Sequence, residues 1–250
     1  MEVIYGINSI KALLRKQEGG WEKIIIASGR GGSSVKEIIE IARQKIIPVE
    51  FYQRKYLDEL AGTPSHQGVI GLCKSFEYSD LDILIKNRNK SFKFDLILIL
   101  DSIMDPQNLG SIIRTAHCLG ANGVVIPEDR AAPVTPAVNK ASAGSVQQIP
   151  VARVINLSQT IDYLKDKGFW VFGAEAHAKS NLQEMDFNCP VVLVLGGEAK
   201  GIRPLVKKKC DFLLSIPMAG SFDSLNVAVA AGIVQYEIFC QRSRTNEVSK

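Results

Sequence analysis

The alternation of strand and helix patterns from Phe94 to the C-terminus is the feature that most constrains the fold. Residues 95–100, DLILIL, form an almost continuous apolar run, which is typical of a parallel strand that helices cover on both faces. We expect strands at 95–100, 124–126, 149–154, 169–174, 191–195 and 212–216, and helices at 108–119, 135–142, 158–167 and 226–242. Alternating units of this kind predict an α/β domain with a mainly parallel sheet.

Residues 1–75 carry the pattern of a second, smaller α/β domain. One helix is expected with Asn8 or Ser9 as its N-cap, and another, capped by Ser33 or Ser34, is expected to extend to Arg43. The strands expected in this part are 23–27, 48–51 and 67–73.

The stretch between the two patterns is polar. Residues 76–93 are rich in charged and amide side chains, as in a linker, although a short helix fits residues 81–85. We therefore expect a small domain at 1–75, a linker at 76–93 and a larger domain at 94–250. The 250 residues of the chain are enough for two domains.

Composition excludes several classes of protein. No apolar run approaches the roughly 20 residues that span a bilayer, and the N-terminus has no basic segment followed by an apolar one. We therefore expect a cytoplasmic protein without a signal peptide or membrane contact. The five cysteines lack a CxxC pair and the three histidines lack ligand spacing, which argues against disulfides and a metal site.

The charge of the chain is weak evidence for a nucleic-acid partner. The formal net charge is +4. Residues 1–75 carry 11 Lys and Arg against 8 Asp and Glu, whereas residues 94–250 balance. The modest excess therefore lies in the small domain, where it fits RNA contact or an ordinary solvated surface equally well.

Three common α/β enzyme classes are disfavoured because their motifs are missing. A dinucleotide-binding domain needs G-x-G-x-x-G directly after its first strand, whereas residues 101–110 contain a single glycine. The Walker phosphate loop and the G-x-S-x-G nucleophile motif are absent as well. A dehydrogenase, NTPase or serine hydrolase is therefore not expected.

Polar, glycine-containing loops follow two of the expected strands. Gly196 and Gly197 end one strand and precede Glu198. Glycine has no Cβ, so a ligand can approach the backbone there. The loop after the last strand places Ser224 and Asn226 just before an Ala/Val-rich helix. Ligands bind at the carboxyl ends of strands in open α/β sheets, so both loops are candidate ligand sites.

Residue type alone leaves the roles of these side chains open. Glu198 fits a surface carboxylate as well as a ligand-binding one, and Ser224 and Asn226 are more often helix caps than catalytic residues. Asn108 could cap the first helix of the larger domain or bind a phosphate at its N-terminus. Arg114, on the same helix, is of a type usually solvated or ion-paired, and its apolar neighbours favour a functional or an ion-paired arginine over a solvated one.

Three irregular segments of the larger domain agree with a known pattern in order and spacing. They are Asn108…Arg114, Gly196-x-Glu198-x-x-Gly201, and Ile216-Pro-Met-x-Gly220-x-x-x-Ser224-Leu-Asn226-Val-x-x-Ala230. Together they resemble the signature motifs of the SpoU (TrmH-like) family of SPOUT RNA ribose 2′-O-methyltransferases. Residues 4–14, 66–71 and 140–144 are also similar to this family, closest to its 23S rRNA guanosine 2′-O-methyltransferase group. Ala228 stands where relatives often carry Ser, a small departure.

The resemblance implies a fold, a cofactor and partners. It implies an L30e-like RNA-binding domain at 1–75 and a SPOUT methyltransferase domain at 94–250, whose C-terminal segment forms a trefoil knot. S-adenosyl-L-methionine (SAM) would be the methyl donor and would bind in the knot. The protein would be a homodimer through the knot region, with active sites built from both subunits and without metal or membrane.

The resemblance also implies roles for individual residues. Because a guanidinium stays protonated, we expect Arg114 to stabilise the developing alkoxide or to hold the adjacent phosphate. The other expected catalytic residues, which would orient Arg114, the ribose and the loops, are Asn108, Glu198, Ser224 and Asn226. The expected cofactor-binding residues are Leu195, Gly196, Gly197, Gly201, Ile216, Met218 and Leu225.

The function that follows is SAM-dependent methylation of the ribose 2′-OH of a guanosine in 23S rRNA. A tRNA substrate is one alternative, and a non-catalytic RNA-binding or ribosome-assembly protein with the same fold is another. The accessory-domain resemblance favours rRNA. The intact set of motif residues disfavours the non-catalytic protein.

Overall fold

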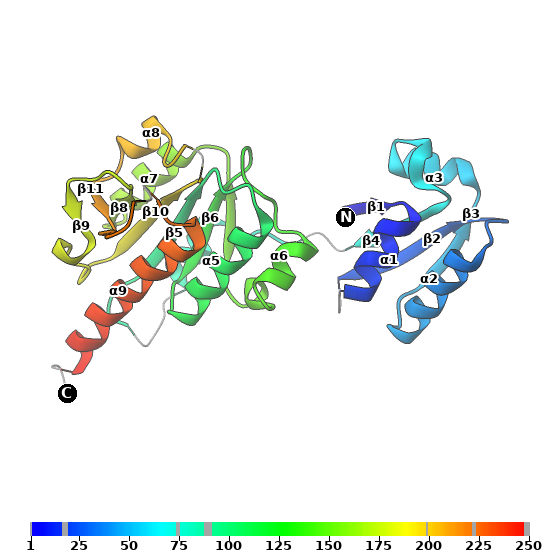
Figure 1. Ribbon diagram of the computed structural model, residues 1–250, viewed down its shortest axis with the longest axis horizontal. Helices are drawn as coiled ribbons and strands as arrows, with labels where there is room; N and C mark the ends of the chain where they lie inside the picture. Colours follow the sequence, from blue (N-terminus) through cyan, green and yellow to red (C-terminus); the bar gives the residue numbers. More distant parts are fainter. Residues whose placement is uncertain are drawn as a thin grey trace. The chain divides into compact units, whose positions relative to one another are not determined.

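Two compact units make up the chain in the computed structural model, which describes residues 2–16, 20–73, 76–87, 92–198, 200–221 and 224–247. The first unit is Met1–Glu77 and the second is Tyr78–Lys250 (Figure 1). The expected domain boundary at residue 75 and the centre of the expected linker, residues 88–91, lie outside the described residues.

The first unit is a four-stranded sheet with helices on both faces. Its strands are β1 (Glu2–Tyr5), β2 (Trp21–Ala27), β3 (Val49–Tyr52) and β4 (Val69–Cys73), and its helical elements are α1 (Ile7–Lys16), α2 (Ser33–Gln44), α3 (Arg54–Ala61) and the 3₁₀ turn η1 (Pro64–His66). The strand order is β1-β4-β2-β3, with β4 antiparallel to both neighbours and β3 parallel to β2. α1 and α2 pack on one face and α3 on the other. Sequence patterns predict neither β1 nor α3, because both are too short for a clear periodic signal.

The side-chain caps expected for two helices of this unit do not form. α1 begins at Ile7, so Asn8 and Ser9 lie inside its first turn. α2 begins at Ser33 after Gly32, and no side chain caps it. Gly32 has a φ of 119°, a conformation that favours glycine, so the backbone itself turns the chain into the helix.

The second unit is built around a seven-stranded sheet in which all the described pairings are parallel. Its strands are β5 (Leu96–Asp101), β6 (Gly123–Pro127), β7 (Val151–Val154), β8 (Trp170–Ala174), β9 (Ser180–Asn181), β10 (Val191–Gly196) and β11 (Phe212–Ser215). The order is β7-β6-β5-β10-β8-β11-β9. The prediction of an α/β protein with a mainly parallel sheet is confirmed.

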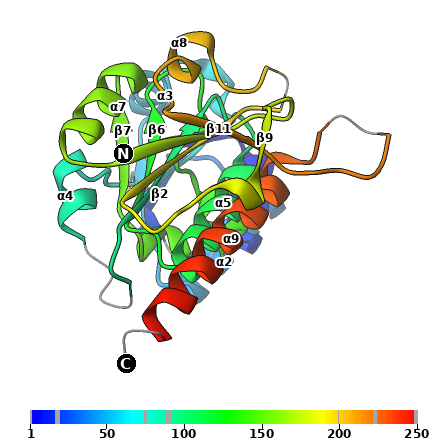
Figure 2. The same ribbon diagram turned by 90° about the vertical axis from the view of Figure 1, so that its left-hand side faces the viewer.

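Helices cover both faces of this sheet. They are α4 (Leu81–Lys86), α5 (Pro106–Cys118), α6 (Pro136–Ala141), α7 (Leu157–Asp166), α8 (Pro204–Lys207) and α9 (Val227–Glu247), with the 3₁₀ turns η2 (Ser145–Gln147) and η3 (Leu182–Glu184). α5 and α9 pack together on one side of the sheet, and α4 and α7 lie on the other (Figure 2). All six residues of β5 are buried, which explains the apolar run at 95–100. None of the described helices has the length and apolar content needed to cross a membrane.

The segment expected to be a linker belongs, over residues 78–87, to the second unit. Leu84 of α4 is fully buried against β6, where a Cβ added to Gly123 would lie 2.2 Å from the leucine side chain. Asn87 and Asn122 exchange two hydrogen bonds of 2.8 Å between side-chain amides and backbone carbonyls. The polar composition hides this packing, because α4 buries only one leucine in its six residues.

The C-terminal helix α9 is anchored to the sheet by Arg242. Its buried guanidinium donates hydrogen bonds of 2.9–3.2 Å to the carbonyl groups of Phe94, Asp95, Phe187 and Cys189. Burial lowers the pKa of Arg242 to about 10, so the arginine is still charged at neutral pH and the carbonyls solvate it. This anchor helps to fix α9, whose other end enters the candidate site.

Candidate active site

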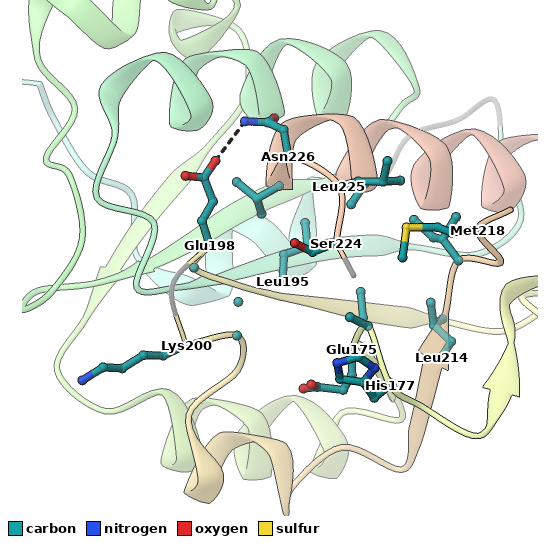
Figure 3. A pocket seen from close by; sticks show the side chains of 18 residues that line it. Glu175, His177, Leu195, Glu198, Lys200, Leu214, Met218, Ser224, Leu225 and Asn226 are labelled. Atoms are coloured by element: carbon teal, nitrogen blue, oxygen red, sulfur yellow. Dashed lines mark hydrogen bonds between the residues drawn. The ribbon is translucent and has the colours of Figure 1, made fainter. Parts of the chain in front are cut away.

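A cavity of about 530 Å³ opens at the carboxyl ends of β8, β10 and β11 (Figure 3). Its volume suits a small organic ligand. All the residues expected to bind the cofactor line it, namely Leu195, Gly196, Gly197, Gly201, Ile216, Met218 and Leu225. Three of the expected catalytic residues line it too: Glu198, Ser224 and Asn226. The fold therefore brings together residues from two separate loops around one cavity.

The loop after β10 is so tight that it requires glycine. The Gly197 N–H donates to the Asp101 carbonyl at 2.9 Å, and the Gly201 N–H donates to the Gly197 carbonyl at 2.8 Å. A Cβ on Gly196 would lie 2.1 Å from the carbonyl carbon of Gly201, which itself has a φ of 63°. Any side chain at Gly196 would push the two arms of the loop apart, so this wall of the cavity depends on its glycines.

A buried ion pair holds the exit of the same loop beside β5. The side chain of Asp101 is fully buried. Its two oxygens accept hydrogen bonds from the Arg203 backbone N–H at 2.8 Å and from Arg203 Nε at 2.6 Å. A buried carboxylate needs such charged and hydrogen-bonding partners. Sequence patterns did not single out this pair, although an aspartate that ends a buried strand is a recognisable signal.

Three side chains from three separate segments meet at one end of the cavity. Asn108 Nδ2 donates to Glu198 Oε1 at 2.8 Å, and Asn226 Nδ2 donates to the same oxygen at 2.9 Å. Asn226 Nδ2 also donates to Asn108 Oδ1 at 3.1 Å. Figure 3 shows Glu198 and Asn226 facing each other. Glu198 Oε2 accepts no hydrogen bond from any residue that the structure describes, so it is available to a ligand.

Asn226 has a structural role as well as a place in this network. Its Oδ1 caps α9 by accepting two backbone N–H groups of the first turn, at 2.9 and 3.3 Å. The cap fixes the orientation of the amide, so that Nδ2 must be the group that meets Glu198. Asn108, in contrast, does not cap α5. That role belongs to Asp105, whose side chain accepts a backbone N–H of the first turn at 3.0 Å.

A second cavity, of about 510 Å³, adjoins the first. The residues that line both cavities are Gly197, Glu198, Lys200, Gly201 and Val227. Asn108 and three cationic side chains, Arg130, Lys200 and Arg203, also line the second cavity. Arg130 has a φ of 61°, a left-handed conformation that is uncommon for a residue other than glycine. Two cavities with a shared wall at Glu198 allow two ligands to meet there, as group transfer requires.

Arg114 is the one expected catalytic residue that the fold does not bring to the two cavities or to the hydrogen-bonded side chains of Asn108, Glu198 and Asn226. It is exposed on α5 and lines neither cavity. It lies six residues after Asn108, which at 100° per residue turns its side chain about 120° away around the helix. Its guanidinium makes no ion pair or hydrogen bond with another residue in the described part of the chain. Ser224 is exposed as well, but it lines the first cavity.

Glu175 and His177, which follow β8, line the first cavity and were not among the expected site residues. In Figure 3 they lie across the cavity from Glu198 and Asn226. Glu175 Oε2 lies 3.2 Å from Lys207 Nζ, and its carboxylate adds negative charge to the cavity wall. Both residues directly follow the strand expected at 169–174. Because ligands bind at the carboxyl ends of strands in open α/β sheets, the sequence could have indicated them. Over the described residues, no group of three or more His, Cys, Asp or Glu side chains could hold a metal ion.

A stripe of large apolar side chains is exposed at the start of α9. Val229, Ile233 and Tyr236 are 39–59% exposed. Their spacing of four and three residues puts them on one face of the helix, and Leu225, 38% exposed, lies just before its first turn. Exposed apolar patches of this kind mark interaction surfaces.

Comparison with known proteins gives matches for both units. Residues 95–236 match the sequence model of the SpoU rRNA Methylase family, and residues 3–79 match that of the RNA 2′-O ribose methyltransferase substrate binding domain. A Bacillus subtilis (strain 168) protein named putative TrmH family tRNA/rRNA methyltransferase YacO is 42% identical over 246 residues, which cover 98% of each chain.

Two solved structures extend this similarity to three dimensions. The SpoU methyltransferase AviRb from Streptomyces viridochromogenes, in complex with the cofactor AdoMet, is 26% identical with a TM-score of 0.62, over 97% of this chain and 90% of that one. The TrmH/SpoU tRNA modifying enzyme of A. aeolicus is 30% identical with a TM-score of 0.58, over 67% of this chain and 83% of that one. The likeness to AviRb covers nearly the whole chain and therefore includes the parallel sheet that carries the two cavities.

Proposed function

This chain belongs to the SpoU rRNA methylase family of RNA methyltransferases, and from that membership we propose that it methylates the ribose 2′-OH of a guanosine in 23S rRNA. The family uses SAM as its methyl donor. The observation that carries the proposal is the pair of adjoining cavities at the Asn108–Glu198–Asn226 network. The match of residues 3–79 to a ribose 2′-O-methyltransferase substrate-binding domain supports the ribose as acceptor.

The first cavity fits SAM in size and chemistry. Its glycine wall leaves room for a ligand beside the backbone, and Ile216, Met218 and Leu225 offer apolar surface to an adenine ring. The Glu175 carboxylate complements the positive charge of the cofactor. Bound SAM supplies an electrophilic methyl group on a sulfonium, which is a good leaving group. In the SPOUT fold the C-terminal segment forms a trefoil knot, which would hold SAM, and residues of the loops after β10 and β11 line this cavity.

The second cavity suits the acceptor ribose. The 2′-OH must lose its proton as it attacks the methyl group in line, so catalysis consists mainly of alignment and proton removal. Asn108 and Asn226 hold one oxygen of Glu198, which leaves the other oxygen to accept a hydrogen bond from the ribose. Ser224 provides a further hydroxyl at the wall of the first cavity.

We propose that Arg114 acts across a homodimer. Its exposure and its lack of a partner among the described residues support a role that one subunit alone does not complete. The apolar stripe of α9, which packs beside α5, supports a dimer interface in this region. Arg114 of one subunit would then enter the acceptor cavity of the other and stabilise the developing alkoxide or the adjacent phosphate.

RNA would be held by cationic groups outside the network. Arg130 and Lys200 line the acceptor cavity and can bind phosphates on either side of the target ribose. The first unit would serve as an L30e-like RNA-binding domain. A ribosomal RNA substrate also agrees with the expected cytoplasmic location.

Methyl transfer from labelled SAM to unmodified 23S rRNA and to unmodified tRNA tests the proposal. We expect 2′-O-methylguanosine in the rRNA alone, identified by mass spectrometry of the nucleosides. Label in tRNA instead would keep the reaction and replace the substrate with that named for the A. aeolicus relative. If neither RNA is labelled and calorimetry detects no SAM binding, the protein is a non-catalytic RNA-binding member of the family.

A further inference from the structure

Six consecutive residues, from the last two of β3 to the first three of α3, are all exposed, and their composition is unusual for a protein surface. Residues 51–56 read Phe-Tyr-Gln-Arg-Lys-Tyr, with three aromatic rings, two cations and no acid. The exposed fractions are 57% for Phe51, 38% for Tyr52 and 41% for Tyr56. Aromatic side chains normally bury most of their large apolar surface. Three exposed rings in one short segment therefore indicate a surface that binds a partner.

Two of the rings are held in a fixed arrangement. Tyr52 and Tyr56 stack with ring centroids 4.6 Å apart and an angle of 28° between planes. The Tyr52 hydroxyl donates a hydrogen bond to the Glu50 carboxylate, which raises the pKa of Tyr52. Lys23 Nζ donates to the same carboxylate at 2.9 Å, so the negative charge of Glu50 beside the rings is balanced.

The helix below the rings gives this arrangement a rigid support. The N–H of Tyr56 donates to the Gln53 carbonyl at 3.0 Å at the start of α3. The next residue, Leu57, is fully buried against Ile25, Ile70 and Leu72 of the sheet. The tyrosine pair is therefore tied to the core at both its strand end and its helix end. Such a surface loses little conformational entropy when it binds a flat ligand.

We propose that Phe51, Tyr52 and Tyr56, together with Arg54 and Lys55, form an aromatic platform that stacks on unpaired bases of the RNA substrate. This inference rests on the proposed function in that the ligand is RNA. Bases in a duplex present no free face, so a stacking surface selects single-stranded segments, loops and bulges. Arg54 and Lys55 are exposed between the rings in the sequence and can pair with the phosphates that link the stacked nucleotides.

The charge of the segment argues for RNA over a second copy of the protein. In a symmetric contact Arg54 and Lys55 would face their own copies, which is repulsive. With RNA the same two cations meet opposite charge. Single-stranded recognition by rings also tolerates different sequences, because every base offers a π face. The platform would thus hold a flexible flanking segment of the RNA rather than the nucleotide that is methylated.

The test measures binding of the full-length protein to a fluorescent single-stranded oligouridine and to a hairpin of equal length. Tyr52→Ala/Tyr56→Ala should raise the Kd for the single strand by about tenfold to a hundredfold. Tyr52→Phe/Tyr56→Phe, which keeps both rings, should stay within about twofold. Ultraviolet cross-linking of the wild-type protein to the oligouridine should map to Tyr52 or Tyr56.

Charge variants separate the platform from general electrostatics. Arg54→Gln/Lys55→Gln should lower the slope of log Kd against log salt by about 1.4, or about 0.7 for each phosphate that the protein no longer neutralises. Lys36→Gln/Arg43→Gln, two exposed cations on α2, is the matched control and should leave that slope unchanged. Equal effects of the two pairs would contradict a localised platform.

The outcomes distinguish this inference from the proposed function. If the wild-type protein methylates RNA but the alanine pair leaves both the Kd and the KM unchanged, the platform is wrong and the enzyme assignment stands. If no RNA is methylated but binding depends on the two rings, the platform stands and the enzyme assignment fails. Equal losses in the alanine and phenylalanine pairs, or a change in oligomeric mass without a change in RNA affinity, would also overturn the platform.

Discussion

The two units present different chemistry at their candidate RNA-contacting residues. In the second unit, the polar side chains of Asn108, Glu198 and Asn226 are hydrogen-bonded to one another, and Asn226 is also bonded to a helix N-terminus. In the first unit, the platform presents aromatic rings, two of them stacked on each other. Methyl transfer needs polar groups held in one geometry, whereas stacking on bases tolerates varied ligands. Changes in the second unit should therefore act on kcat, and changes to the platform should act on RNA affinity.

The largest expected effect comes from Arg114. Arg114→Ala should abolish turnover while SAM affinity stays within a few-fold, because the residue lines neither cavity and its proposed role concerns the transition state alone. Single-turnover methyl transfer and SAM calorimetry measure the two quantities. A loss of SAM binding would show that Arg114 supports the cofactor cavity instead.

Mixed dimers sharpen this prediction. Arg114→Ala and Glu198→Ala subunits, each inactive alone, should recover about a quarter of the wild-type activity when mixed, since half of the dimers are then mixed and carry one intact site each. No recovery is expected if Arg114 serves the site of its own subunit. Exchange of subunits is checked by native mass spectrometry.

The next largest effect should follow from Glu198. Glu198→Ala removes the acceptor that unites Asn108 and Asn226 and should lower kcat by about 10²- to 10³-fold, since alignment of the ribose is lost. The Kd for single-stranded RNA should not change, because the platform lies in the other unit. Glu198→Gln, which keeps one acceptor oxygen, should lose less. An unchanged kcat in the alanine variant would disprove the role of the network.

A smaller effect is expected at the glycine wall. Gly196→Ala should weaken SAM binding by about tenfold or more and destabilise the second unit by about 1–3 kcal/mol, because its Cβ would overlap the backbone of Gly201. Gly220→Ala is the matched control, since a Cβ there meets no atom within 4 Å. Calorimetry measures the SAM affinity of both variants and thermal unfolding measures their stability. Equal values for the two variants would contradict the prediction.

The smallest effect concerns the stability provided by Asn226. Asn226→Ala should lower the free energy of unfolding by about 1 kcal/mol, because the N-cap of α9 is lost. Asn226→Ser can still cap the helix but is too short to reach Glu198. Both variants should lower kcat, and only the alanine variant should lower the urea midpoint. A stable but inactive serine variant separates the two roles of this residue.

Much of the second unit follows from local sequence patterns. The expected strands 95–100, 191–195 and 212–216 match β5, β10 and β11 to within one residue at each end, because a strand buried on both faces is a continuous apolar run. The helix at 108–119 begins two residues earlier than expected, since Asp105 and Pro106 start it. The short helix that fits residues 81–85 matches α4 to within one residue. Its packing on the second unit was not expected, because burial of one leucine in a polar segment leaves almost no periodic signal.

Most residues of the candidate site were expected from the sequence, but the contacts among them were not. The seven residues expected around the cofactor all line one cavity, because each lies at or after the end of a parallel strand and these ends share one edge of the sheet. Glu175 and His177 lie at the same edge and were not among the expected site residues. The aromatic platform left no sequence signal either, since rings at 51–56 fit a buried strand and helix as well as a surface.

The sequence by itself determined the parallel sheet, the glycine loops and the family, because each depends on residues close together in the chain or on motif spacing. The tertiary structure alone decided which polar groups meet. Asn226 and Asn108 are 118 residues apart, and their hydrogen bond exists only because α9 returns beside α5. It also decided that the face of α5 that carries Asn108, and not the face that carries Arg114, meets this network, since the covered face of a helix depends on what packs against it.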